Sequence, residues 1–367
     1  MGHMRKTILL LISHSCNLSC KYCYEKFKAP KRMTWDQARR ILEKEFSDGF
    51  DDIESIDLLG GEPLSNFTII PQICSWVWNH SPEIKVFSRT NGTLLTDAMK
   101  AWFIEHKERF TLGLSIDGTP ETNRINRGIA NLDIDFFQEY WPENPVKMTI
   151  FPDSVKLLYE SLHYLYSRGL DVTGGLAQGV RWDDNSCVEL KKQLDSLCDF
   201  YIANPSVAIM KPLFDLDFHR AFWMPESQED ADPPCWSVAN IHTYDCDGEL
   251  LPCHMFSRIV QGDEKRKTIL NDSLQVEHEL LPEDCMKCPI RWCCKNCMAM
   301  NYQHYGSFEK NINLKLMCKA QKVVAYASAN LLLNQASGKE HSLEDEEYRQ
   351  SVSNAIKYVR LIEENGF

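Results

Sequence analysis

Strand and helix patterns alternate regularly through the first half of this 367-residue chain, and this alternation constrains its fold more than any other feature. The stretch Arg5 to Ser13 contains the continuous apolar run Ile8 to Ile12, which is typical of a parallel strand covered on both faces. Further strands are expected at Ile53–Leu59, Ile84–Arg89, Phe110–Ser115, Val146–Phe151 and Leu170–Ala177. This alternation predicts an α/β fold with a partial (β/α)6 barrel, shorter than the usual eight-unit barrel of about 250 residues.

Helix signals separate these strands. Thr34 with Gln37 three residues later forms a capping box, which predicts a helix to about Phe46. Further helices are expected near residues 66–80, 96–106, 132–140, 154–168 and 185–201, and a polar stretch is expected from 119 to 127. Because the loops that follow parallel strands gather at one edge of a barrel, we expect them to form the catalytic rim.

The alternation breaks at Asn204. Residues 4–203 are therefore predicted as the barrel domain and residues 204–232 as a linker. Nine of the fifteen cysteines fall between Cys235 and Cys318, so residues 233–320 are predicted as a separate, small, metal-organised domain. Residues 321–367 are predicted as C-terminal helices, at 323–333 and 344–363.

Composition and charge exclude several classes of protein. An odd number of cysteines in tight clusters argues against a disulfide framework, so we expect reduced thiols in a cytoplasmic, anaerobic setting. The net charge of −12, with no concentrated basic stretch, predicts that nucleic acid is not a partner. No segment reaches the ~18 uninterrupted apolar residues of a membrane span, so no membrane association is expected.

Three cysteines lie on the loop that follows the first strand: Cys16, Cys20 and Cys23. Three thiolates can ligate one face of a cubic iron–sulfur cluster, which leaves the fourth iron without a protein ligand. A zinc loop with His14 as the fourth ligand is the alternative that these residues leave open. A strand followed by a ligand-bearing loop at the rim of a barrel favours the cluster.

The cysteine spacing, with an aromatic residue before the last cysteine, resembles the signature of the radical S-adenosylmethionine (SAM) enzymes. This resemblance implies a 4Fe-4S cluster whose open iron is chelated by SAM. One electron then cleaves SAM to give a 5′-deoxyadenosyl radical, which abstracts hydrogen from the substrate. The cofactor-binding residues that the resemblance implies are Tyr22, the GGEP run of Gly60, Gly61, Glu62 and Pro63 for the SAM ammonium, Asn91, Ser115 and Asp117 for the ribose, and Arg127 for the carboxylate.

The C-terminal cysteines resemble the SPASM domain, which carries two auxiliary 4Fe-4S clusters. By this resemblance the first cluster is held by Cys235, Cys253 and Cys297, with Cys246 as an added ligand. The second is held by Cys285, Cys288, Cys294 and Cys318. Three 4Fe-4S clusters in total are therefore expected, and full ligation suits the auxiliary pair to electron transfer.

One spacing departs from the SPASM pattern, which has three residues between its last two clustered cysteines. Cys294 and Cys297 are separated by two, whereas Cys293 and Cys297 would restore three, so the choice between Cys293 and Cys294 stays open. A zinc ribbon using Cys285, Cys288, Cys294 and Cys297 is the alternative for this region.

The resemblance implies a peptide-modifying oxidoreductase. We expect a radical SAM/SPASM maturase that forms an oxidative C–C or C–S crosslink in a ribosomally made precursor peptide, with flavodoxin or ferredoxin as electron donor. In the related anaerobic sulfatase maturases, which make formylglycine from Cys or Ser, an aspartate base follows the second SPASM cysteine. Here His254 follows Cys253 and is the candidate base or substrate contact.

Two alternatives to peptide crosslinking remain. Formylglycine formation on a protein Cys or Ser is weakened, but not excluded, by the histidine at position 254. A non-catalytic iron–sulfur or zinc protein for electron transfer or assembly belongs to another class, and metal analysis distinguishes it. No leader-recognition domain is expected before the barrel, because the first strand begins by Thr7.

Overall fold

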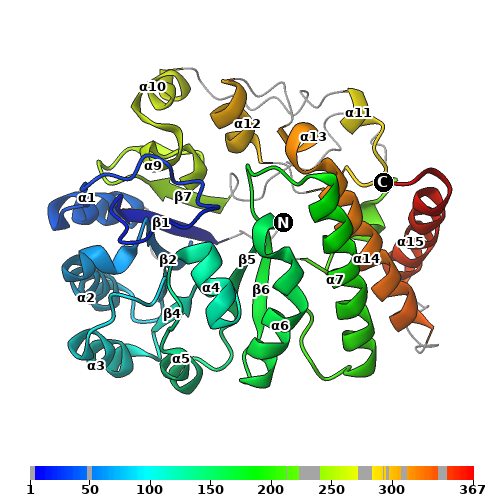
Figure 1. Ribbon diagram of the computed structural model, residues 1–367. Helices are drawn as coiled ribbons and strands as arrows, with labels where there is room; N and C mark the ends of the chain where they lie inside the picture. Colours follow the sequence, from blue (N-terminus) through cyan, green and yellow to red (C-terminus); the bar gives the residue numbers. More distant parts are fainter. Residues whose placement is uncertain are drawn as a thin grey trace. The chain divides into compact units, whose positions relative to one another are not determined.

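The computed structural model describes residues 5–47, 52–211, 213–222, 240–271, 283–291, 293–294, 297–306, 312–337 and 345–367 (Figure 1). The chain forms two compact units. The first unit comprises residues 1–116, 131–146 and 235–275, and the second comprises residues 117–130, 147–234 and 276–367. The predicted domain boundaries at 203, 232 and 320 stay predictions.

A six-stranded sheet forms the centre of the first unit, with strand order β4-β3-β2-β1-β7-β8. Neighbouring strands are parallel except β7 and β8, which pair antiparallel. The strands are β1 (Lys6–Ser13), β2 (Ile53–Gly60), β3 (Lys85–Thr90), β4 (Phe110–Leu114), β7 (Ile241–Tyr244) and β8 (Leu250–Leu251). The predicted α/β class is confirmed, and the sheet of this unit is mostly parallel.

The central strand β1 is buried on both faces, as its sequence predicts. Ile8, Leu10 and Ile12 are fully buried on one face. Leu9 and Leu11 point to the other face, where they pack with Leu251 of β8. Because β1 is covered on both faces and pairs with β2 and β7 at its two edges, the loop that leaves its end starts from a fixed position.

Helices of the first unit follow the expected alternation. The capping box of α1 (Trp35–Glu45) forms between Thr34 and Gln37. In place of one helix at residues 66–80, the chain forms the 3-10 helix η1 (Pro63–Ile69) followed by α2 (Ile70–His80). Helices α1 and α2 pack on each other (Figure 1). The other helices of this unit are α3 (Asp97–His106), α5 (Ile134–Tyr140), η4 (His254–Phe256), α9 (Arg258–Gln261) and α10 (Asp263–Asn271).

The second unit contains a two-stranded sheet and several helices. The strands are β5 (Val146–Ile150) and β6 (Val172–Leu176). Helix α14 (Cys318–Ala336) packs against both α7 (Asp184–Ala203) and α15 (Glu346–Asn365) (Figure 1). The remaining helices are α4 (Pro120–Arg127), η2 (Pro152–Leu157), α6 (Leu158–Ser167), η3 (Phe218–Arg220), α11 (Glu283–Met286), α12 (Met298–Tyr305) and α13 (Ile312–Leu316).

Two features differ from the sequence-based expectation. The polar stretch at residues 119–127, where no helix was predicted, forms α4, because Thr119 caps it and Gly128 in a left-handed conformation ends it. Strand β7 was not predicted, since it has only four residues and lies in the cysteine-rich region.

Phe218 and Ala221, in the range predicted as a linker, are buried in the core of the second unit. Among the described residues, no helix has an apolar stretch long enough to cross a bilayer.

A buried carboxylate ties α1 to the sheet. Glu45 pairs with Lys6 of β1 at 2.9 Å and with His242 of β7 at 2.9 Å, and it accepts a hydrogen bond from Tyr244. Burial by itself would raise the pKa of Glu45, but the hydrogen bonds from Tyr244, Lys6 and His242 hold that pKa below its ordinary value. The carboxylate therefore stabilises the fold in its charged form.

Replacing this carboxylate should destabilise the first unit. We expect Glu45→Gln to lower the free energy of unfolding by about 1–3 kcal/mol at pH 7, because it removes the charge that pairs with the half-buried Lys6 and weakens the hydrogen bond from the buried Tyr244. Since the folded pKa is depressed, the stabilisation is present above the ordinary pKa of 4.5 and is lost as the pH falls through the folded pKa. Denaturant unfolding of the full chain measures the difference.

Glu43 provides the matched control on the same helix. Its side chain is 52% exposed and lies 3.8 Å from Arg39. Glu43→Gln should change the free energy of unfolding by less than about 0.5 kcal/mol. Equal effects of the two substitutions would contradict the role given to Glu45.

Candidate cofactor site

The three N-terminal cysteines lie on a loop whose two ends are paired with each other. We call residues 14–33, between the end of β1 and α1, the cysteine loop. At its base, the His14 amide donates to the Lys31 carbonyl at 2.9 Å, and the Ala29 amide donates to the His14 carbonyl at 3.2 Å. Ser13 and Arg32 also form an antiparallel bridge. The loop is therefore a closed excursion from the end of β1.

The cysteine side chains on this loop are half-buried. A turn brings Cys20 and Cys23 together, with the Cys23 amide donating to the Cys20 carbonyl at 3.1 Å. Burial, the main cause, and the nearby Glu25 raise the pKa of Cys23 to about 11, while the Lys28 ammonium acts in the opposite direction. Burial also raises the pKa of Cys16. These groups are therefore thiols at neutral pH, and metal binding must release their protons.

The GGEP run follows β2 and lies against the start of the cysteine loop. The Gly61 amide donates to the Ser13 carbonyl and the Glu62 amide donates to the Ser15 carbonyl, both at 2.9 Å. A Cβ atom on Gly61 would lie 2.8 Å from the Ser15 oxygen and 3.0 Å from the Cys16 Cβ. Glycine is therefore required for this close approach of two backbones.

The Glu62 carboxylate joins the loops after β2 and β3. It is 1% exposed and accepts hydrogen bonds from the Leu64 amide at 3.1 Å, the Thr90 hydroxyl at 2.7 Å and the Asn91 amide at 2.8 Å. The Asn91 side chain in turn donates to Asn17 of the cysteine loop at 3.0 Å. Three loops at the carboxyl ends of β1, β2 and β3 are thus linked through side chains.

Thr90 and Asn17 were not singled out from the sequence. Their signal is positional: Thr90 is the last residue of β3, and Asn17 lies inside the cysteine run. Of the other predicted residues in the first unit, Tyr22 and Ser115 are half-buried, and the Ser115 amide donates to the Thr90 carbonyl at 2.9 Å. This bond brings the loop after β4 into the same network.

In the second unit, two of the predicted SAM-binding residues pair with each other. Arg127 at the end of α4 donates to the Asp117 carboxylate at 2.9 Å, and both side chains are buried. The same carboxylate accepts the Asn126 amide at 3.3 Å and the Thr149 backbone amide at 3.0 Å. This helix therefore fixes the orientation of the Arg127 guanidinium relative to Asp117.

The segment that follows β7 carries three of the predicted residues. Cys246 is fully buried and its thiol donates to the Leu11 carbonyl at 2.9 Å, while burial raises its pKa to about 12. Cys253 is also buried. The His254 ring lies beside that of Tyr24 in the cysteine loop, with centroids 6.4 Å apart, and burial lowers the pKa of His254 to about 4. His254 is therefore neutral at physiological pH.

A second group of cysteines gathers in the second unit. Cys288 and Cys318, together with Cys293 and Cys294, lie near enough to Tyr358 to raise its pKa along with burial, which is the main cause. Cys285 is joined to this group because the Cys288 amide donates to its carbonyl at 3.1 Å. Cys297 precedes α12 and is half-buried. Cys235 lies outside the described residues.

Cys293 and Cys294 differ in their surroundings. The Cys293 thiol is buried and donates to the Asp217 carbonyl at 3.1 Å, and burial raises its pKa to about 12. Cys294 is half-buried. A buried thiol that already bonds to a carbonyl is the less available ligand of the two.

Comparison with known proteins gives one family match and several relatives. The model described as the Radical SAM superfamily matches residues 10–176. A GTP 3′,8-cyclase of Clostridium perfringens is 33% identical over 146 residues, which are 38% of this chain and 43% of that protein. A cysteine-type anaerobic sulfatase-maturating enzyme of the same species is 28% identical over 125 residues, 31% of this chain and 33% of that protein. The chain thus spans less than half the length of these relatives.

Solved structures resemble most of this chain in fold, at low sequence identity. Native anSMEcpe with bound AdoMet and Cp18Cys peptide has a TM-score of 0.66 at 18% identity, covering 91% of this chain and 99% of that one. Streptococcus suis SuiB bound to the precursor peptide SuiA has a TM-score of 0.57 at 16% identity, covering 84% of this chain and 75% of that one. At these identities the likeness concerns the fold alone.

The close approach at Gly61 can be tested by substitution. Gly61→Ala should lower the free energy of unfolding by about 1–3 kcal/mol, because its new methyl group must displace the Ser15 carbonyl or Cys16. Gly175→Ala is the matched control, since a Cβ on Gly175 meets nothing within 4 Å. Denaturant unfolding of the full chain measures both. If Gly61→Ala were as stable as Gly175→Ala, the cysteine loop would not be held by this contact.

Proposed function

We propose that this chain is a radical SAM/SPASM maturase that crosslinks a ribosomally made peptide, because the Radical SAM superfamily model matches residues 10–176. A Radical SAM domain implies a 4Fe-4S cluster and SAM as cofactors. The observation that carries the proposal is the arrangement at the end of β1, where a loop with three half-buried cysteines is held against the GGEP run. The electron would come from flavodoxin or ferredoxin, in a cytoplasmic setting.

The residues at this site fit the two cofactors. Cys16, Cys20 and Cys23 would hold three irons, since they share one closed loop and are accessible. Gly60 and Gly61 leave no side chain between the GGEP backbone and that loop, so backbone groups can face the SAM ammonium. When bound, the cluster and SAM supply a 5′-deoxyadenosyl radical that abstracts hydrogen from the substrate.

The proposal also assigns the remaining predicted residues to parts of SAM and to the cluster. Asn91 and Ser115 would meet the ribose, and their backbones are fixed by the Glu62 carboxylate and by Thr90. Asp117 would share that role, and Arg127 would pair with the SAM carboxylate while held by Asp117. Tyr22 would cover the cluster.

Two auxiliary 4Fe-4S clusters complete the proposal. Cys285, Cys288, Cys294 and Cys318 would hold one, which is supported by their position around Tyr358. Cys294 is preferred to Cys293 because the Cys293 thiol is buried and bonded to a carbonyl. Cys235, Cys253 and Cys297 would hold the other cluster, and Cys246 could join them only by giving up its bond to Leu11.

A peptide substrate is supported by the fold. Two neighbours in fold have bound peptides, Cp18Cys in one and the precursor SuiA in the other. The cysteine-rich region beyond residue 235 lies outside the range matched by the Radical SAM model, which ends at residue 176. Formylglycine formation is the second candidate, favoured by the match to a sulfatase-maturating enzyme.

Iron analysis tests the cluster assignment directly. We expect about twelve irons per chain after anaerobic reconstitution, and about eight in Cys16→Ala, because three cysteines hold one four-iron cluster. Cys74→Ala is the control, since Cys74 is fully buried in α2 and should leave the iron content unchanged. Zinc with little iron, or equal iron in the two variants, would refute the proposal. Formation of 5′-deoxyadenosine from SAM under reductant must follow the same pattern.

His254 is proposed to act on the peptide substrate rather than on SAM. Its ring lies beside Tyr24, one residue after Cys23, which places it next to the radical-generating loop. We expect His254→Ala to slow peptide conversion at least about tenfold, as for loss of a general base, while 5′-deoxyadenosine formation without peptide is kept. Mass spectrometry of the peptide and chromatography of the nucleoside measure the two rates. Unchanged peptide conversion would remove His254 from the mechanism.

A further inference from the structure

His14 is the first residue of the cysteine loop, and both its backbone and its side chain form hydrogen bonds. It lies two residues before Cys16 and is 1% exposed. Its backbone closes the base of the loop through Lys31 and Ala29, as described above. A displacement of His14 would therefore break the backbone hydrogen bonds that join the two ends of the loop.

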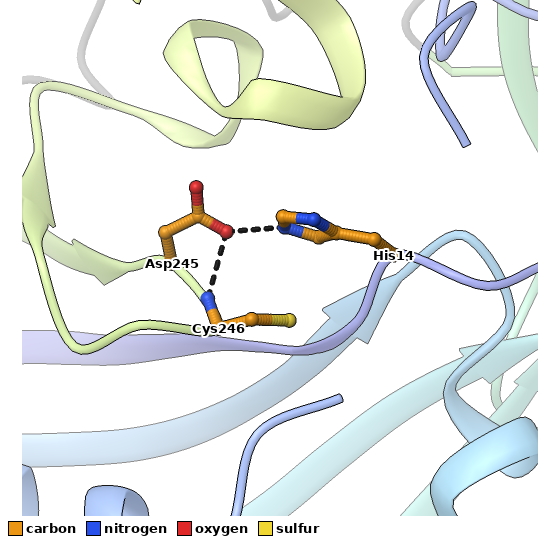
Figure 2. Close-up of side chains that lie close together, drawn as sticks. All are labelled: His14, Asp245 and Cys246. Carbon is orange, nitrogen blue, oxygen red and sulfur yellow. Dashed lines mark hydrogen bonds and ion pairs between the residues drawn. The ribbon is translucent and has the colours of Figure 1, made fainter. Parts of the chain in front are cut away.

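The His14 side chain reaches a residue far away in sequence. Its Nε2 atom pairs with the carboxylate of Asp245, in the turn after β7 (Figure 2). The same Asp245 oxygen accepts the Cys246 amide at 2.7 Å, and the pair is almost fully excluded from solvent. Figure 2 shows this oxygen between the imidazole ring and the Cys246 backbone.

The second oxygen of Asp245 faces positive charge. Arg266 of α10, 1% exposed, lies 3.4 Å from it, and the Arg258 amide donates to it at 3.4 Å. A buried carboxylate with these partners is a fixed charge, and removing one partner leaves the others uncompensated.

A metal ion is the other occupant to consider, because atoms of His14, Asp245 and Cys246 lie within 4.8 Å of one another. Two contacts argue against it. The Arg266 guanidinium, which also pairs with Asp247 and Glu249, lies 3.4 Å from Asp245, and it would repel a second cation placed there. The Cys246 thiol donates to the Leu11 carbonyl at 2.9 Å, so it acts as a donor rather than a thiolate ligand.

Two further contacts join the same pair of segments. The Phe27 amide of the cysteine loop donates to the Ile259 carbonyl of α9 at 2.9 Å. Lys31 pairs with Asp247 at 3.0 Å. Together with the ring contact between Tyr24 and His254, these contacts attach the loop to residues 245–266, and the His14–Asp245 contact is almost fully buried.

We propose that the buried His14–Asp245 pair, backed by Arg266, is the positioning device of the radical SAM cluster loop. Through this pair, the segment that carries Cys253 and His254 sets the conformation of the loop that carries Cys16, Cys20 and Cys23. The inference rests on the proposed function for the identity of the cluster, but the local positioning can be measured without it.

The test uses hydrogen exchange in the full chain, as purified and after iron loading. Exchange of the amides in residues 14–33 should be at least about tenfold faster in His14→Phe and in Asp245→Asn than in the wild type. Exchange in α7 and α14 should stay unchanged, which a general loss of stability would not allow. In His14→Gln the amide nitrogen can donate from about the position of Nε2, so most of the protection should return.

Spectroscopy supplies the second readout. Addition of SAM to the reduced, iron-loaded wild type should alter the electron paramagnetic resonance signal of one cluster, and this response should be lost or halved in His14→Phe and kept in His14→Gln. Asp263→Asn is the matched control, since Asp263 is 68% exposed and pairs with Arg258 at 3.2 Å on the surface. It should behave as the wild type.

Three results would overturn the proposal. The first is equal exchange of residues 14–33 in His14→Phe, Asp245→Asn and the wild type. The second is an effect of Asp263→Asn as large as that of Asp245→Asn. The third is one equivalent of zinc that is lost in Asp245→Asn, which would make the link a metal site. A wild type without bound iron would refute the proposed function alone, because the exchange data still decide the positioning role.

Discussion

The site depends on the pairing of β1 along both edges. This strand hydrogen-bonds in parallel to β2 on one side and to β7 on the other, so its end is fixed by segments more than 40 and more than 200 residues away. The cysteine loop leaves from that end and returns to it through the His14 backbone. A loop with such a base can present three thiols from a defined place, which cluster binding requires.

The cysteine loop is held by close backbone contacts and by buried carboxylates, and substitutions at these contacts have little room. Gly61 and Glu62 approach Ser13 and Ser15 backbone to backbone, and the Glu62 carboxylate then fixes the loop after β3. Asp245 fixes the loop entrance from the opposite edge of β1. The first unit therefore supports the cysteine loop from both strands that neighbour β1. The support after β2 is close backbone packing, and the support after β7 is the buried His14–Asp245 pair.

Much of this arrangement follows from local sequence. The β1 burial pattern and the capping box at Thr34 are short-range signals, and each forms the expected element. The partners that sequence reasoning missed are long-range. Asp245 has no local mark that relates it to His14, and β7 is too short to be recognised by periodicity. Helix α4 was hidden because polar residues fill it, although Thr119 and Gly128 mark its ends.

The central claim is that the cysteine loop holds a cluster with one iron open to SAM. Electron–nuclear double resonance on the reduced, iron-loaded chain with SAM labelled by ¹⁵N at the methionine amine tests this most directly. The account predicts a nitrogen coupling that is present in the wild type and absent in Cys16→Ala. A fully loaded cluster complement that shows no coupling to labelled SAM would contradict it.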